Sequence, residues 1–181
     1  MRAPYLESER LIYKPLSLAH LSQDYVEWLN KPEVYRYLES GGNYTMEMLN
    51  IFLEEVEKKQ ILFWGIHTKT NGIHIGNIKI DPISKRHGTG EYGILMGCIT
   101  EWGKGYAKEA SQSIIDFCFN VENLRKITLG VVLDNISAVK MYEILGFTVE
   151  GHYKKHGIYE GKYCDVLRMA LFNPHFSYDE E

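Results

Sequence analysis

The sequence predicts one domain of mixed α and β structure, in which strands and helices alternate through the second half. The clearest evidence is a helical pattern over residues 107–118, where small and apolar side chains recur three or four positions apart. Segments rich in β-branched and aromatic residues lie on both sides of it, bounded by glycine, asparagine or proline turn signals. No repeat or linker divides residues 1–181, so we interpret them as a single domain.

The first third of the chain predicts one short strand followed by two helices. The strand covers residues 10–14, and Ser17 then caps a helix that ends before Pro32. Thr45 caps the second helix, and the polar segment 39–43 forms the loop between the two. The apolar faces consist of Leu18, Leu21, Tyr25, Trp28 and Leu29 in the first helix, and of Met46, Leu49, Phe52, Leu53 and Val56 in the second.

Three strands are expected next, over residues 61–68, 73–80 and 90–97. Asn71-Gly72 separates the first two, and this dipeptide is typical of a tight hairpin turn. Asp81-Pro82 is expected to end the second strand, because proline cannot donate a ladder hydrogen bond.

After the long helix, the chain returns to strands with one further helix between them. Residues 125–133 are β-branched and aliphatic, which is typical of a buried strand. A short helix follows over residues 135–145, and Gly146 is placed to end it. Residues 147–150 and 162–171 complete the set of predicted strands.

The composition excludes several classes of protein. A formal charge of -4 with scattered lysines and arginines argues against nucleic-acid binding, which needs a basic face. No apolar run approaches the roughly eighteen residues of a membrane span, so no membrane partner is expected. Cys98, Cys118 and Cys164 are odd in number and contain no C-x-x-C pair, which favours reduced thiols in the cytoplasm. The chain is expected to be a monomer or a homodimer.

The glycine-rich segment 97–107, GCITEWGKGYA, joins a predicted strand to the long helix, so backbone amides at a helix N-terminus are available for a phosphate group. A P-loop is excluded, because it needs glycine at Cys98 and serine or threonine at Gly105. A dinucleotide fingerprint fails at Lys108, where glycine is required. Two interpretations remain: a diphosphate site made from the backbone, with Lys104 or Lys108 adding charge, or a tight turn without a ligand.

Two motifs make the chain resemble the GNAT superfamily of N-acetyltransferases. They are WGKGYAKEA at residues 102–110 and DNISAVKMYEILGF at residues 134–147. Three further segments look like the RimJ/RimL-like branch, which acetylates the N-termini of ribosomal proteins. These are ERL at residues 9–11, WLNKPEV at 28–34 and the segment 150–167.

The resemblance implies the GNAT fold, a curved, mixed and mostly antiparallel sheet flanked by helices. It also implies acetyl-CoA as co-substrate, no metal, and a primary amine as acceptor: a protein N-terminus, a polyamine, an amino sugar or a similar small amine. Trp102 stands where the family's phosphate-binding turn usually carries Arg or Gln, so backbone amides are expected to bind the diphosphate. The expected cofactor contacts are Leu95, Met96, Gly97, Trp102, Gly103, Lys104, Gly105, Tyr106, Ala107, Asn135, Ala138 and Tyr142.

Two side chains are predicted to carry the chemistry. An alkylammonium is protonated at pH 7 and only the neutral amine attacks a thioester, so a base is required. Glu91 is the candidate, directly or through a water chain, and it is also expected to contact the acceptor. Tyr142 aligns with the family's tyrosine near the leaving sulfur, where its phenol would donate a hydrogen bond. The structural alternatives are a surface glutamate without a role and a tyrosine that only packs; Asn135 could likewise only cap its helix.

The acceptor side is expected to include Trp28 and Tyr37, because the family builds acceptor specificity from its first two helices and their loop. A second hypothesis is a non-catalytic acyl-CoA-binding sensor or interaction module. Nucleophilic catalysis by Cys98 is disfavoured, because no base adjoins it in sequence. His152 and His156 have the spacing of helical metal ligands, but the surrounding glycines predict a hairpin instead.

Overall fold

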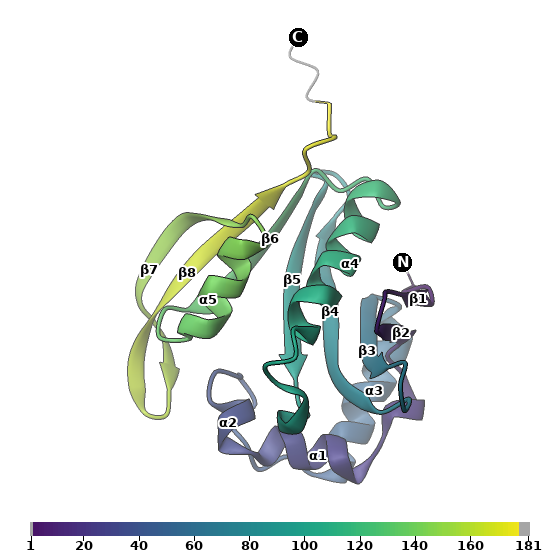
Figure 1. Ribbon diagram of the computed structural model, residues 1–181. Helices are drawn as coiled ribbons and strands as arrows, with labels where there is room; N and C mark the ends of the chain where they lie inside the picture. Colours follow the sequence, from purple (N-terminus) through teal and green to yellow (C-terminus); the bar gives the residue numbers. More distant parts are fainter. Residues whose placement is uncertain (1, 178–181) are drawn as a thin grey trace.

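A computed structural model of the chain, whose residues 2–177 are described, contains an eight-stranded sheet flanked by helices (Figure 1). The strand order is β1-β2-β3-β4-β5-β6-β8-β7, and within these residues every neighbouring pair is antiparallel except β5 and β6. The strands are β1 (Leu6–Glu7), β2 (Leu11–Pro15), β3 (Leu62–Thr68), β4 (His74–Ser84), β5 (Thr89–Met96), β6 (Lys126–Val132), β7 (Thr148–Tyr159) and β8 (Lys162–Phe172). The helices are η1 (Leu18–His20), α1 (Gln23–Asn30), α2 (Pro32–Tyr35), α3 (Met46–Lys59), η2 (Ile99–Glu101), α4 (Tyr106–Asn120) and α5 (Ile136–Ile144). The predicted mixed, mostly antiparallel sheet is confirmed.

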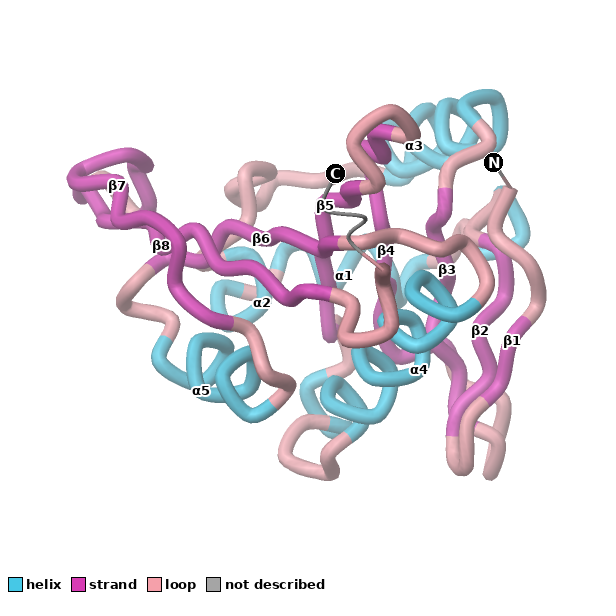
Figure 2. The backbone as a smooth tube through the Cα atoms, turned by 90° about the horizontal axis from the view of Figure 1, so that it is seen from above, coloured by secondary structure: helices cyan, strands magenta, loops and turns pink. Residues whose placement is uncertain are grey.

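Helices cover both faces of the sheet, because successive residues of a strand point to opposite sides. On β3, the Phe63 ring contacts Phe52 of α3, while the next residue, Trp64, contacts Phe117 of α4. One core therefore lies between the sheet and α4 and α5, and a second lies between the sheet and α1 and α3. Figure 2 shows α3 on one side of β3 and β4, with α4 on the other.

Several local predictions are confirmed. The Thr45 hydroxyl accepts a hydrogen bond from the Met48 amide and caps α3. Gly146 follows α5 at a φ of 93°, a backbone conformation that glycine adopts without steric cost. Along residues 2–177 no helix is both long enough and apolar enough to cross a bilayer.

The predicted first helix is divided in the structure. Ser17 caps only the 3-10 turn η1, where the His20 side chain completes a capping box. The chain then extends at Leu21, and Ser22 caps a separate helix, α1, by accepting a hydrogen bond from the Tyr25 amide. Two serines with competing caps five residues apart explain the division, since each side chain accepts from backbone amides that follow it and so starts a helix of its own.

Two predicted boundaries are wrong. Asp81-Pro82 does not end the second strand, because β4 continues to Ser84 through a register shift between Ile80 and Ile83. A bulge leaves these residues outside the ladder, so the missing proline N–H costs no pairing. The predicted end of the first helix before Pro32 is confirmed, since α1 ends at Asn30, and Pro32 begins a separate short helix, α2, where a missing N–H is tolerated. The strand predicted at residues 147–150 extends to Tyr159.

Three imidazoles form a cluster on the α1 side of the sheet. The rings of His20, His67 and His74 lie 4.9 to 5.2 Å apart, centroid to centroid. The Nε2 atom of His20 is buried and has no hydrogen-bond partner within the described residues. Burial and the neighbouring imidazoles lower the pKa of His67 to about 4 and that of His74 to about 3. The folded protein therefore holds both rings neutral at pH 7.

This cluster predicts loss of stability in mild acid. The folded-state pKa values lie below the unfolded value of about 6.5, so the unfolded chain binds more protons between roughly pH 6.5 and pH 3. Stability is complete above this window and falls as pH decreases, by at most about 1.4 kcal/mol per pH unit for each imidazole. Urea unfolding from pH 7.5 to 4 measures the slope. His74→Gln should reduce it, exposed His87→Gln should not, and equal slopes would contradict the prediction.

Candidate active site

The central feature of the site is the point where β5 and β6 separate. The two strands run parallel, and beyond their last paired residues β5 continues to Met96 and β6 to Val132 with no ladder between them (Figure 1). The facing strand edges therefore offer backbone N–H and C=O groups that an extended ligand can bind as an added strand. The paired positions are Thr89 with Lys126, Gly90 with Ile127 and Glu91 with Thr128.

The glycine-rich turn connects the separated end of β5 to helix α4. Gly103 and Gly105 have φ angles of 74° and 80°, in the left-handed region that favours glycine. Gly105 is also the N-cap of α4 and supplies no side-chain hydrogen bond. The first-turn amides, including those of Tyr106 and Ala107, are thus left without a side-chain cap, and the helix dipole favours an anion there.

Two side chains of this turn bond to the protein. The Trp102 indole is 43% exposed, and its Nε1 donates to the Met96 carbonyl oxygen at 2.9 Å. The Lys104 ammonium pairs with the Glu101 carboxylate at 2.9 Å, an interaction that raises the lysine pKa. Trp102 therefore attaches the turn to the end of β5, and part of the Lys104 charge is neutralised locally.

Tyr142 places a buried phenol beside the separated strands. Helix α5 carries it, and its ring contacts Tyr92 of β5 at 5.7 Å and Phe147 at 5.8 Å, centroid to centroid. Burial raises the pKa of Tyr142 to about 12, so the hydroxyl stays protonated at any working pH. Within the described residues this hydroxyl has no hydrogen-bond partner. The packing interpretation is thus correct for the ring, and the hydroxyl remains able to donate.

Asn135 caps α5, as the sequence predicted. Its Oδ1 accepts hydrogen bonds from the Ala138 amide at 3.4 Å and from the Ser137 hydroxyl at 3.2 Å. The cap uses the oxygen and leaves the Nδ2 donors of the same amide group for a ligand. On β5, Leu95 packs against the core that contains α1, and Met96 against the core that contains α4; their contact with a cofactor stays a prediction.

Glu91 lies at the last position where β5 and β6 pair, and it is held by two donors. Its Oε2 accepts from the Arg168 guanidinium at 2.7 Å and from the Thr128 hydroxyl at 2.6 Å. These bonds outweigh burial and lower the pKa of Glu91. A cavity of about 200 Å³ opens beside it, lined by Pro82, Ile83, Ser84, Thr89, Gly90, Glu91 and Thr128.

Arg168 is a residue that sequence analysis missed. It is opposite Gly130 in the β6–β8 ladder, and a Cβ at Gly130 would lie 2.9 Å from the guanidinium. A larger residue at this position would require the guanidinium to shift from its present contact with Glu91. An isolated glycine in a strand indicates a close approach of another group, so Gly130 was the available signal.

Trp28, which the sequence predicts on the acceptor side, lies against the chain directly after β5. Its buried indole lies against the backbone of Gly97, where a Cβ would overlap the ring. The ring also contacts His74, at 4.9 Å between centroids. Trp28 thereby connects α1 to the end of β5, and its exposure of 6% shows that it packs in the second core.

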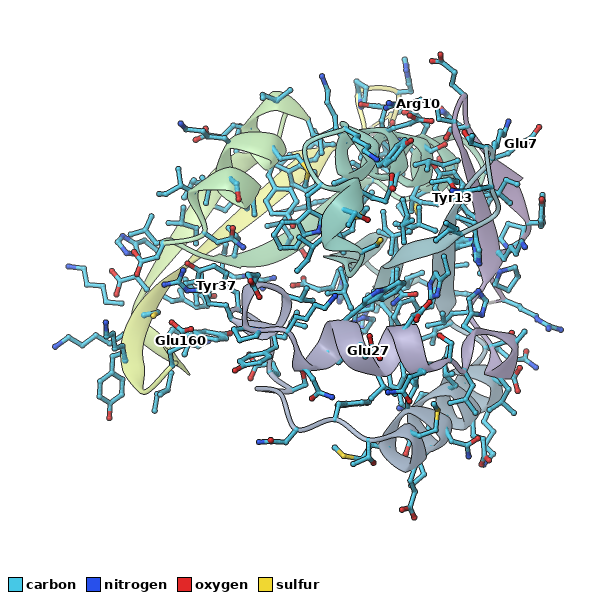
Figure 3. The ribbon with its side chains drawn as sticks, turned by 60° about the horizontal axis from the view of Figure 1, so that its bottom comes forward. Glu7, Arg10, Tyr13, Glu27, Tyr37 and Glu160 are labelled. Carbon is cyan, nitrogen blue, oxygen red and sulfur yellow. The ribbon has the colours of Figure 1, made fainter. Side chains whose placement is uncertain are left out.

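Tyr37 is placed differently, in the loop after α2. Its hydroxyl donates to the Asp134 carbonyl oxygen at 3.3 Å, next to the α5 cap, and its ring contacts Tyr159 at the end of β7. Arg36 pairs with Glu160 in the same region, and Figure 3 shows Tyr37 and Glu160 on the same side of the molecule. The structure therefore joins this loop to the β7–β8 hairpin, a contact that sequence analysis did not foresee.

The residues weighed as nucleophile or metal ligands lie in ordinary surroundings. Cys98 contacts the Thr100 hydroxyl at 3.2 Å. His152 pairs with Asp165 at 2.7 Å within the β7–β8 hairpin, and His156 contacts the ring of Tyr153. Across residues 2–177, no group of three or more His, Cys, Asp or Glu side chains is arranged to hold a metal ion.

Known proteins that resemble this chain include several N-acetyltransferases. Over 97 residues the chain is 35% identical to spermidine N(1)-acetyltransferase of Vibrio cholerae, covering 54% of this chain and 56% of that protein. The match thus spans about half of the relative's length. The structure of spermidine N-acetyltransferase from Vibrio cholerae in complex with CoA and spermine superimposes with a TM-score of 0.82 at 24% identity, over 90% of this chain and 95% of that one.

A second solved structure has the same fold at lower identity. The ribosomal-protein-S5-alanine acetyltransferase from Vibrio fischeri matches with a TM-score of 0.82 at 18% identity, over 97% of this chain and all of that one. The expected fold is thereby confirmed. Residues 10–148 match the acetyltransferase (GNAT) domain family, which is well over half of the sequence. This chain therefore belongs to the GNAT acetyltransferase family.

Proposed function

We propose that residues 1–181 form one acetyl-CoA-dependent N-acetyltransferase domain that acetylates a primary amine by direct attack in a ternary complex. The observation that carries this proposal is the separation of β5 from β6, with an uncapped helix N-terminus at one end and the unpaired Tyr142 hydroxyl beside it. The strand edges suit the amide-containing arm of CoA, and the first turn of α4 suits its diphosphate. We place this activity in the cytoplasm.

In the proposed reaction the amine nitrogen attacks the thioester carbonyl carbon. A C–N bond forms, the C–S bond breaks, and the sulfur leaves with the electron pair while the nitrogen loses a proton. Tyr142 donates a hydrogen bond to the sulfur as its negative charge develops. Complete proton transfer from Tyr142 is uphill, because its pKa of about 12 is above the value of about 8.5 typical of a thiol.

Glu91 takes up the ammonium proton, directly or through water. Its pairing with Arg168 makes it a weak base, so the proton passes on to solvent rather than staying on the carboxylate. Glu91→Gln should lower kcat by about tenfold to a hundredfold and change the KM for acetyl-CoA little. Steady-state kinetics measure both. Glu150→Gln removes a carboxylate paired with Lys126 outside the site and is the control. An unchanged kcat for Glu91→Gln would assign deprotonation to water alone.

The acceptor class is proposed from the relatives and from charge. The spermidine acetyltransferase match and the net charge of -4 favour a small cationic amine, with polyamines first. The RimJ/RimL-like segments at residues 9–11 and 28–34 make a protein N-terminus the second candidate.

Release of CoA thiol from acetyl-CoA tests the proposal, using polyamines, peptide N-termini, amino sugars and aminoglycosides as acceptors. One acceptor that is turned over establishes the reaction and its substrate class. Acetyl-CoA binding by calorimetry with no turnover would favour the non-catalytic sensor instead. Absence of acetyl-CoA binding would overturn both. Monomer or homodimer stays a prediction, which sedimentation of the same preparation decides.

A further inference from the structure

We infer that Arg10 is a positioning residue for the diphosphate-binding turn, an inference that rests on the proposed function. Arg10 immediately precedes β2, far in sequence from residues 102–107. Its guanidinium nevertheless contacts both the loop before α4 and the first turn of that helix. Nε donates to Glu109 Oε2 at 2.6 Å, and Nη1 donates to the Lys104 carbonyl oxygen at 2.9 Å. One planar group thus sets the separation of the loop and the helix.

Other atoms of the guanidinium also lie close to the turn. Its carbon lies 4.6 Å from the centroid of the Tyr106 ring, a cation–π distance. A Cβ at Gly105 would lie 3.5 Å from Nη2, so that nitrogen borders the N-cap of α4. Three consecutive residues, Lys104 to Tyr106, are therefore contacted by one side chain. The amides expected to bind the diphosphate lie within this stretch of backbone or directly beside it.

Charge is a second reason for Arg10 at this place. Glu109 is in the first turn of α4, where its carboxylate would repel a bound diphosphate. Arg10 supplies the compensating charge, and Ser8 and the Arg10 backbone amide donate to the other oxygen of Glu109 at 2.6 and 2.8 Å. The Glu109 carboxylate therefore faces β2, and the positive charge of Arg10 offsets its repulsion of an anion at the helix N-terminus.

A role in stability alone does not account for these contacts. The Arg10 side chain is 43% exposed and that of Glu109 is 16% exposed, and an ion pair that solvent reaches on one side contributes only modestly to stability. Figure 3 shows Arg10 at the surface, above Tyr13. Loss of the guanidinium would leave the core intact and free the Lys104 carbonyl and the Glu109 carboxylate. The expected consequence is weaker binding of the diphosphate, with unchanged binding of the rest of CoA.

Calorimetry with three ligands tests this inference without an acceptor. CoA and dephospho-CoA both contain the diphosphate, whereas pantetheine does not. Arg10→Gln should weaken CoA and dephospho-CoA equally, by about tenfold or more, and leave the pantetheine affinity, measured by competition, unchanged. Arg125→Gln is the matched control, since the Arg125 guanidinium also donates to a backbone carbonyl, that of His87, at 2.6 Å. Arg125 lies just before β6, at the end of that strand where it still pairs with β5.

The outcomes separate this inference from the proposed function. If wild-type protein does not bind CoA, the proposed function fails. If it does, an equal loss for all three ligands would show a general folding role for Arg10, and unchanged affinities would show no role; either overturns the inference. A loss confined to CoA would assign Arg10 to the 3′-phosphate and also overturn it. Arg10→Lys keeps the charge but cannot reach both partners, so full recovery would overturn the geometric argument.

Discussion

Tyr142→Phe should lower kcat about a hundredfold and leave the affinity for acetyl-CoA within about twofold. The substitution removes one oxygen from a ring that is 7% exposed and packed against Tyr92 and Phe147, so the aromatic contacts persist. The substitution removes the proposed donor to the departing sulfur, and the loss of one donor to developing charge typically costs about that factor. Stopped-flow thiol release and calorimetric binding measure the two quantities separately.

Tyr92→Phe is the matched control for this prediction. Tyr92 belongs to the same aromatic group, but its hydroxyl bonds to Ser111 at 2.6 Å and is fully engaged there. Its loss should reduce stability by about 1 kcal/mol and leave kcat nearly unchanged. If Tyr142→Phe lowered stability without lowering kcat, the phenol would be a packing residue and the sulfur would have another donor.

Because burial raises the pKa of Tyr142 to about 12, its ionisation should not appear in the pH profile of kcat below about pH 11. The expected profile rises with pH as the acceptor amine loses its proton and then stays level. Tyr142→Phe should therefore lower the plateau without moving the inflection.

Gly97→Ala should destabilise the protein by about 2 to 3 kcal/mol and reduce activity with it. An added Cβ would overlap the Trp28 indole, which is 6% exposed and has no free space to occupy. Either α1 moves away from the sheet or the end of β5 moves, and the second displaces the strand edge proposed to bind CoA. Urea unfolding measures the stability, and calorimetry measures the change in CoA affinity.

Two variants make this result interpretable. Gly93→Ala adds the same methyl group four residues earlier, within β5, but the Cβ meets the flexible Lys79 side chain at 3.3 Å, so a small effect is expected. Trp28→Leu in the Gly97→Ala background removes the ring that causes the overlap and should cost less than the sum of the single changes. Strict additivity of the two would show that the indole is not the obstacle.

Local patterns predicted the parts of the fold that depend on near neighbours. The periodicity of residues 107–118 and the Thr45 and Asn135 caps were all predictable, because each depends on side chains within a few positions. The hairpin at Asn71-Gly72 was also predictable, although its connection from Thr68 to His74 is longer than the expected tight turn. The helix predicted after Ser17 was wrong for the same kind of reason. Ser22 caps its own helix five residues after Ser17, a local competition between caps that apolar spacing does not reveal.

The spacing of motifs along the chain indicated the superfamily, the candidate Tyr142 and the backbone turn before α4. The surroundings of these residues depend on the fold: Arg168 on Glu91, Tyr37 on the Asp134 carbonyl, and Arg10 on the Lys104 carbonyl. These contacts join residues 77, 97 and 94 positions apart. Their physical cause is the order of strands in the sheet and the packing of helices on it. Charge and geometry at the site therefore come from elements that no local pattern connects.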